Sequence, residues 1–69
     1  MLTFEGKVQG VQLYESSMIR STIRLAGHLN DTACTITIET NRETAKLIEN
    51  HYGLDAGSVV VQLGNGGEL

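Results

Sequence analysis

The stretch from Ala33 to Gly53 changes its hydrophobic period part-way along, and this change constrains the fold more than any other feature. In the first half, Cys34, Ile36 and Ile38 alternate with threonines and a glutamate, which is the pattern of a strand with one buried face. β-Branched residues are abundant here and suit a pleated, half-buried surface. The sequence therefore predicts a strand that ends near Thr40.

The second half of the stretch predicts a capped amphipathic helix. The segment from Thr40 to Glu43 fits a capping box, in which the Thr40 hydroxyl accepts from the backbone N–H of Glu43. Asn41 is a competing cap one residue later, and Gly53 is predicted to end the helix in the left-handed conformation. A helix of about twelve residues is marginal in water, so this one must pack on a sheet. The predicted apolar face consists of Ala45, Ile48 and Tyr52, with Thr44 and Leu47 on its flanks.

Residues 19–29 alternate between an apolar and a polar set and predict a long strand before the central one. Asn30 and Asp31 tolerate positive φ and predict a hairpin turn between the two strands. Pairing outward from that turn sets Gly27 opposite Cys34 and Leu25 opposite Ile36, so that both strands bury the same face. The remaining expected pairs are Leu29 with Thr32, Ile23 with Ile38, Arg24 with Thr37 and Thr22 with Glu39.

The N-terminal residues predict a first strand that pairs with the 19–29 strand. Its apolar alternation shifts phase at Gly10, which indicates a β-bulge. The turn is expected at residues 15–17. With that bulge the expected pairs are Leu13 with Ile19, Val11 with Ser21, Val8 with Ile23, Gly6 with Leu25 and Phe4 with Gly27, the last placing an aromatic over a strand glycine.

Together these elements predict an α+β fold with the order β-β-β-α-β, in which one helix packs on one face of a four-stranded mixed sheet. The last strand covers residues 59–63, with Val59, Val61 and Leu63 facing inward, and Leu54 is expected to be buried. A right-handed crossover makes the third and fourth strands parallel. The fourth strand lies beside the first or beside the third, and we favour the order 3-2-1-4. Residues 1–63 form a single domain and residues 64–69 a flexible C-terminal tail.

The 69-residue length allows one domain with a small core. A single cysteine excludes an intrachain disulfide and is typical of a reducing compartment, so we expect a cytoplasmic location. The N-terminus lacks the pattern of a signal peptide, and no apolar run approaches the roughly 18 residues that span a bilayer. A net charge of −3 gives an acidic chain with no global attraction for nucleic acid or an anionic membrane.

No group of residues has the spacing of a catalytic or metal site. Cys34, His28 and His51 are the soft ligands, but they include no close pair, and His28 and Cys34 fall on opposite faces of the predicted sheet. The same separation argues against a Cys/His nucleophile. The glycine-rich residues 64–67 lead into no helix and so do not form a phosphate loop. We therefore expect no enzyme, no cofactor and no metal.

Two functional hypotheses remain. The first is a non-catalytic protein-interaction module, a regulatory, inhibitory or assembly factor that forms a homo-oligomer through its sheet edges. The second is a nucleic-acid-binding domain, less favoured because the chain has few aromatics on which bases could stack and two of these, Phe4 and Tyr52, are assigned to the core. Its ligand face would consist of Arg20, Arg24 and His28, with Lys7 beside them.

Overall fold

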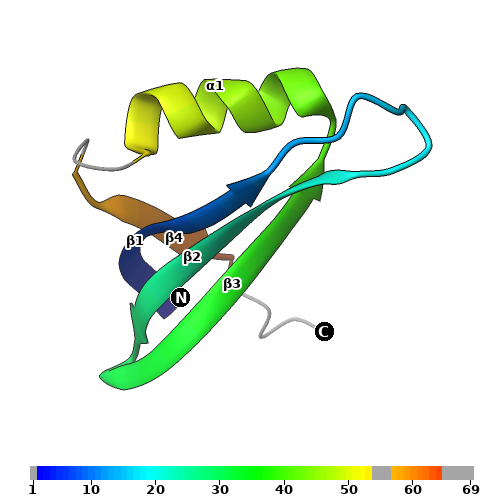
Figure 1. The fold of residues 1–69 in the computed structure, drawn as a ribbon. Helices are drawn as coiled ribbons and strands as arrows, with labels where there is room; N and C mark the ends of the chain where they lie inside the picture. Colours follow the sequence, from blue (N-terminus) through cyan, green and yellow to red (C-terminus); the bar gives the residue numbers. More distant parts are fainter. Residues whose placement is uncertain (1, 54–56, 65–69) are drawn as a thin grey trace.

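The computed structural model describes residues 2–53 and 57–64, which form four strands and one helix (Figure 1). The helix lies across one side of a sheet whose strands are ordered β3-β2-β1-β4. This confirms the α+β fold, the element order and the preferred strand order. The elements are β1 (Leu2–Gln12), β2 (Ser21–Leu29), β3 (Thr32–Thr40), α1 (Arg42–Tyr52) and β4 (Val59–Leu63).

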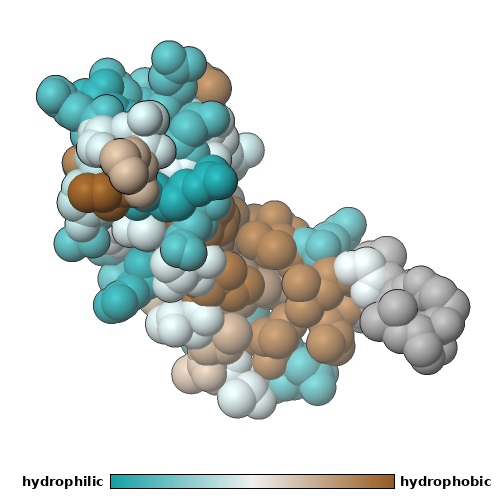
Figure 2. Space-filling model, turned by 90° about the vertical axis from the view of Figure 1, so that its right-hand side faces the viewer, coloured by the Kyte–Doolittle hydropathy of each residue, from teal (hydrophilic) through white to brown (hydrophobic). Residues whose placement is uncertain are grey.

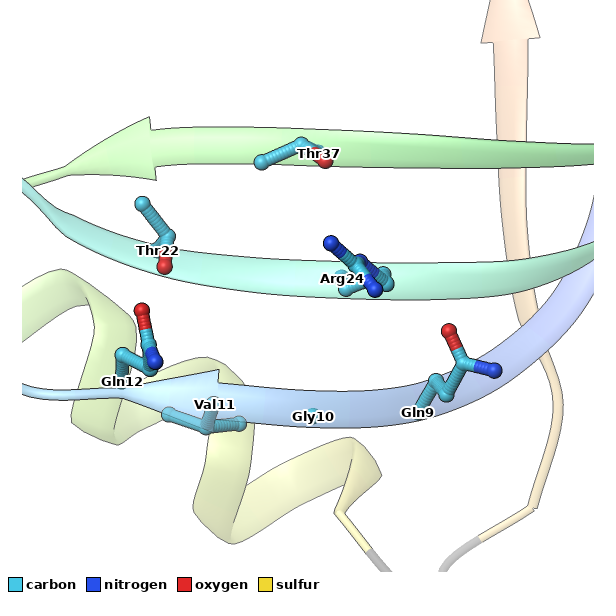
Figure 3. A pocket seen from close by; sticks show the side chains of 7 residues that line it. All are labelled: Gln9, Gly10, Val11, Gln12, Thr22, Arg24 and Thr37. Atoms are coloured by element: carbon cyan, nitrogen blue, oxygen red, sulfur yellow. The ribbon is translucent and has the colours of Figure 1, made fainter.

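The sheet is antiparallel throughout, whereas the crossover rule predicted a mixed sheet. β1 pairs antiparallel with both β2 and β4, so β4 runs against β3. The crossover rule fixes the handedness of a connection between parallel strands, but it does not require that two strands joined by a helix be parallel. β1 is also strongly curved (Figure 1). β4 pairs only with the N-terminal part of β1, from Leu2 to Gly6, and it lies across the direction of β2 and β3 (Figure 3). After the helix, the chain therefore joins the sheet beside the N-terminal part of β1, where the strands no longer follow the direction of β3.

The β2–β3 hairpin has the predicted register along its whole length. Leu29 pairs with Thr32, Leu25 with Ile36, and the remaining predicted pairs are also found. Asn30 and Asp31 adopt φ of 50° and 64°, as a two-residue turn of the favoured kind requires. A short turn leaves one register available, and this explains the agreement.

The β1–β2 register is wrong by two residues, although the faces are right. Val8 pairs with Leu25 and Val11 with Ile23, with the predicted irregularity between Val8 and Gly10. The error arises because β2 starts at Ser21 and residues 13–20 form a longer connection than the predicted turn. The buried Ser21 hydroxyl accepts a hydrogen bond from the Tyr14 backbone N–H at 3.0 Å, which anchors this connection.

Two glycines let β1 and β2 approach closely where β1 curves. Gly6 pairs with Gly27, and a Cβ atom added to Gly27 would overlap the Glu5 carbonyl oxygen and lie 2.5 Å from the Gly6 Cα. A Cβ atom on Gly6 would lie 2.7 Å from Cζ of Phe4. The Phe4 ring therefore covers a strand glycine as expected, but that glycine is Gly6 on its own strand and not Gly27.

Both ends of α1 differ from the sequence prediction. The cap is Asn41, whose side-chain oxygen accepts from the Thr44 N–H at 2.7 Å, and Thr40 remains the last residue of β3. Gly53 has an extended conformation (φ −75°) and is not left-handed. Its N–H bonds the Glu49 carbonyl oxygen at 2.8 Å. A Cβ at Gly53 would overlap that same oxygen, so close approach is the reason for glycine here.

The core is small and lies between the helix and the curved sheet. Phe4, Ile23, Leu25 and Ala45 are its fully buried apolar side chains among the described residues. The helix packs mainly over β1 and β2, which accounts for burial of Ala45 and partial burial of Ile48.

Two side chains that were predicted to face the core are exposed. The Tyr52 side chain is 43% exposed, since it lies in the last turn of the helix. Leu63 is 41% exposed, because it pairs with the exposed Leu2 at the outer end of β4. Val59 and Val61 pack against the core as predicted. Leu54, most of the loop before β4, and residues 65–69 of the tail lie outside the described residues. The single domain and its tail remain predictions.

Replacing Gly27 with alanine should destabilise the fold, because the new methyl would meet the backbone of Glu5 and Gly6, which cannot rotate away. Overpacking of this kind costs roughly 1–3 kcal/mol. Gly10→Ala is the matched control, since nothing lies within 4 Å of a Cβ atom there. Urea unfolding followed by circular dichroism measures both. Equal stability of the two variants would contradict the close approach.

Candidate functional site

The sheet face opposite the helix carries three of the four predicted ligand residues. Lys7 pairs with Ala26, Arg24 lies between Gly10 and Thr37, and His28 lies between Glu5 and Ala33. All three side chains are exposed. Arg20 is also exposed, but it precedes β2 and belongs to the 13–20 connection. Arg20 therefore lies outside the sheet and does not continue the row of Arg24 and His28 along β2.

Arg24 stands in a shallow hollow of this outer face (Figure 3). The hollow forms at the β-bulge, where Gly10 contributes no side chain. Its polar lining offers amide, hydroxyl and guanidinium groups, which can bind an anionic or hydrogen-bonding ligand. Among the described residues, no side-chain hydrogen bond uses the guanidinium group of Arg24. The lining residues are Gln9, Gly10, Val11, Gln12, Thr22, Arg24 and Thr37.

His28 has different surroundings from Arg24. It lines a second hollow with Thr3, Glu5, Asn30 and Asp31. Two carboxylates next to this histidine repel a phosphate backbone. Exposed Glu39 also lies on the outer face, opposite Thr22 and diagonal to Arg24. Acidic groups therefore lie near both Arg24 and His28, and this face has no purely cationic region.

The soft ligands do not converge. His28 and Cys34 occupy strand positions of opposite parity, since Cys34 pairs with Gly27, and His51 lies in the last turn of the helix. The half-buried Cys34 thiol donates to the Thr35 carbonyl oxygen at 3.7 Å. Within residues 2–53 and 57–64, no three histidine, cysteine or acidic side chains are placed to hold a metal ion.

β3 and β4 are the two edges of the sheet, and each leaves one side of its backbone unpaired. β3 has nine residues and β4 has five. Cys34, Ile36 and Ile38 point to the core side of β3 and are only half-buried. Because the helix packs mainly over β1 and β2, it leaves this row partly uncovered. Figure 2 shows apolar side chains gathered in one continuous area beside the polar surface of the molecule.

Sequence reasoning missed a second exposed apolar feature, in the 13–20 connection. Met18 is 93% exposed and Ile19 is 52% exposed. The sequence pattern predicts Ile19 on the buried face of a strand because it continues the period of Ile23 and Leu25. The turn predicted at residues 15–17 instead extends to Arg20. The Met18 N–H bonds the Ser16 hydroxyl at 3.2 Å, and the Ile19 N–H bonds the Ser16 carbonyl oxygen at 3.2 Å.

Comparison with protein-family models, with curated proteins and with solved structures finds no match to this chain. The helix that the structure describes is too short and too polar to cross a membrane. The sheet edges and the Arg24 hollow are the two surfaces of the described residues that bear on function.

Proposed function

We propose that this chain is a small non-catalytic protein-interaction module that associates with a second copy of itself through the edges of its sheet. In that role it acts as a regulatory, inhibitory or assembly factor whose further partner the surface does not specify. A cytoplasmic location, consistent with the free thiol of Cys34, belongs to the same proposal.

The open edge of β3 carries this proposal. An unpaired edge strand is a template for another strand, and soluble monomers usually protect it with lysine, proline or a bulge. The sequence of β3 contains none of these. Pairing there would also extend the partly uncovered apolar row of Cys34, Ile36 and Ile38, which adds hydrophobic burial to the backbone hydrogen bonds.

The small core is a second support. Four apolar side chains are fully buried among the described residues, and domains of this size often need a disulfide, a metal or a partner subunit. The one cysteine cannot form an intrachain disulfide. A partner subunit would add stability through burial across a dimer interface.

Sedimentation equilibrium over a wide concentration range at low and high salt tests the proposal. We expect a species of twice the 7.5 kDa chain mass at both salt concentrations, because apolar burial and backbone hydrogen bonds are weakly screened by salt. A monomer over the whole range would contradict self-association.

Binding of single-stranded nucleic acid to the outer face is the second candidate function, and the polar hollow around Arg24 is the observation that favours it. The acidic surroundings of His28 weigh against it. The small number of exposed aromatic side chains on which bases could stack also weighs against it. Among the described residues these are Tyr14 and Tyr52.

Fluorescence anisotropy with a labelled single-stranded oligonucleotide at low and high salt tests this second candidate. If it holds, Arg24→Ala should weaken binding several-fold and reduce its salt dependence, because one phosphate contact is lost. His28→Ala is the control and should change binding little, since His28 lies beside Glu5 and Asp31. Absence of binding at low salt would eliminate this candidate.

A further inference from the structure

We infer that the self-association surface is the β3 edge, and that β3 of one copy pairs antiparallel with β3 of a second copy about a two-fold axis at Ile36. This inference rests on the proposed function and specifies its edge, its partner and its register. The resulting assembly is one continuous sheet that runs through both copies.

Length selects β3 over β4, and its composition suits strand pairing. β3 spans nine residues and β4 five, so β3 offers more unpaired backbone groups. Glu39 is the one charged residue in β3. The strand is otherwise rich in threonine and isoleucine, whose branched side chains pack well across paired strands.

The two faces of β3 and its length together determine the register. Cys34, Ile36 and Ile38 are half-buried, whereas Thr35 and Thr37 are exposed on the other face. Residues directly opposite each other point to the same side of a sheet, so pairing must keep apolar with apolar residues. Placing Ile36 opposite Ile36 of the second copy achieves this, because Cys34 then faces the second Ile38. Since Ile36 is the middle residue of Thr32–Thr40, this register also uses the full strand.

The backbone of β3 has its free hydrogen-bonding groups at the right positions. In a hairpin with a two-residue turn, the flanking residues Leu29 and Thr32 form a hydrogen-bonded pair, and such pairs then alternate along the strands. The even-numbered residues of β3 therefore bond β2. Residues 33, 35, 37 and 39 direct their N–H and C=O groups to the open edge. In the register centred on Ile36 they pair with residues 39, 37, 35 and 33 of the second copy, which allows about eight hydrogen bonds.

Charge does not oppose this register. Glu39 faces Ala33 of the second copy, and the two Glu39 residues lie about 20 Å apart, which is six residues along a strand. At physiological ionic strength that distance exceeds the screening length, so their repulsion is weak. Within each copy Glu39 pairs with the neutral Thr22.

The core side of β3 is covered over only part of its area, because Cys34, Ile36 and Ile38 are half-buried and the helix packs mainly over β1 and β2. The molecule is also thin, at 37 × 32 × 17 Å, as expected of a sheet that is covered over only part of its area.

Disulfide trapping tests the register. Cys34→Val first removes the native thiol. Thr35→Cys and Thr37→Cys are then made in separate chains, one of which carries a size tag. The two chains are mixed and oxidised. Residues 35 and 37 of different copies lie opposite each other in the inferred register, about 5.5 Å apart at Cα. We therefore expect the mixed pair to cross-link at least several-fold faster than either variant alone. Val60→Cys, which is exposed on β4, is the control for random collisions and should cross-link slowly.

The outcomes separate the inference from the proposal on which it rests. A dimer in sedimentation with no preference for the mixed pair would overturn the β3 register and leave self-association intact. Faster cross-linking of Thr37→Cys alone would indicate an axis at Thr37. Faster cross-linking of Val60→Cys would indicate an interface at β4. Either result would overturn the inference. A monomer in sedimentation would overturn the proposed function itself.

Blocking the β3 edge is an independent test. Thr35→Pro removes an N–H that points to the open edge and leaves the β2–β3 bonds intact, so the hairpin should still form. We expect dimerisation to weaken roughly tenfold or more, because two hydrogen bonds are lost and each proline ring obstructs the partner strand. Thr35→Ala keeps the N–H and should still dimerise. Circular dichroism confirms that both variants fold, and a folded Thr35→Pro dimer of wild-type affinity would contradict the inference.

Discussion

The close contact between Gly6 and Gly27 is the constraint on which the rest of the structure depends. Without side chains at these two positions, the backbones of β1 and β2 approach each other, and β1 can curve away from the direction of the hairpin. The curve presents Leu2–Gly6 to β4, places the Phe4 ring over Gly6, and lets one short helix close the remaining side of the core. In the same geometry the helix packs mainly over β1 and β2 and leaves β3 partly uncovered. The uncovered edge is thus a consequence of how the core is built.

The sequence predicted most reliably those features that are determined over a few residues. The β2–β3 register followed from Asn30 and Asp31, because a two-residue turn permits one pairing. The β1–β2 register did not follow, because residues 13–20 can close a hairpin in several ways and the bond from Tyr14 to Ser21 decides between them. The helix start was ambiguous for a related reason. Thr40 and Asn41 are both good caps. Thr40 is still part of β3, where it pairs with Ser21, so Asn41 caps the helix.

The candidate surfaces also differ in how far the sequence predicts them. The sheet edges could be expected from the element order and from the absence of proline, and the structure has edges at β3 and β4. The hollow around Arg24 could not be expected, because it needs the bulge at Gly10, residues of three strands and the observed register. Composition gave the overall charge but not its arrangement. The pairing of Glu5 with His28 emerges only when β1 is placed beside β2.

The pairing of β4 with the N-terminal part of β1 has a consequence for the order in which the chain folds. The β2–β3 hairpin closes a two-residue loop and can form within microseconds, whereas the Leu2–Leu63 pair joins two residues that are far apart in the sequence. During synthesis, β1 leaves the ribosome long before β4 has been made. The segment from Leu2 to Gly6 must therefore wait, with one side of its backbone unpaired, until residues 59–63 are available. Pairing of β4 with β1 is thus the last strand pairing of this sheet that can form on a growing chain.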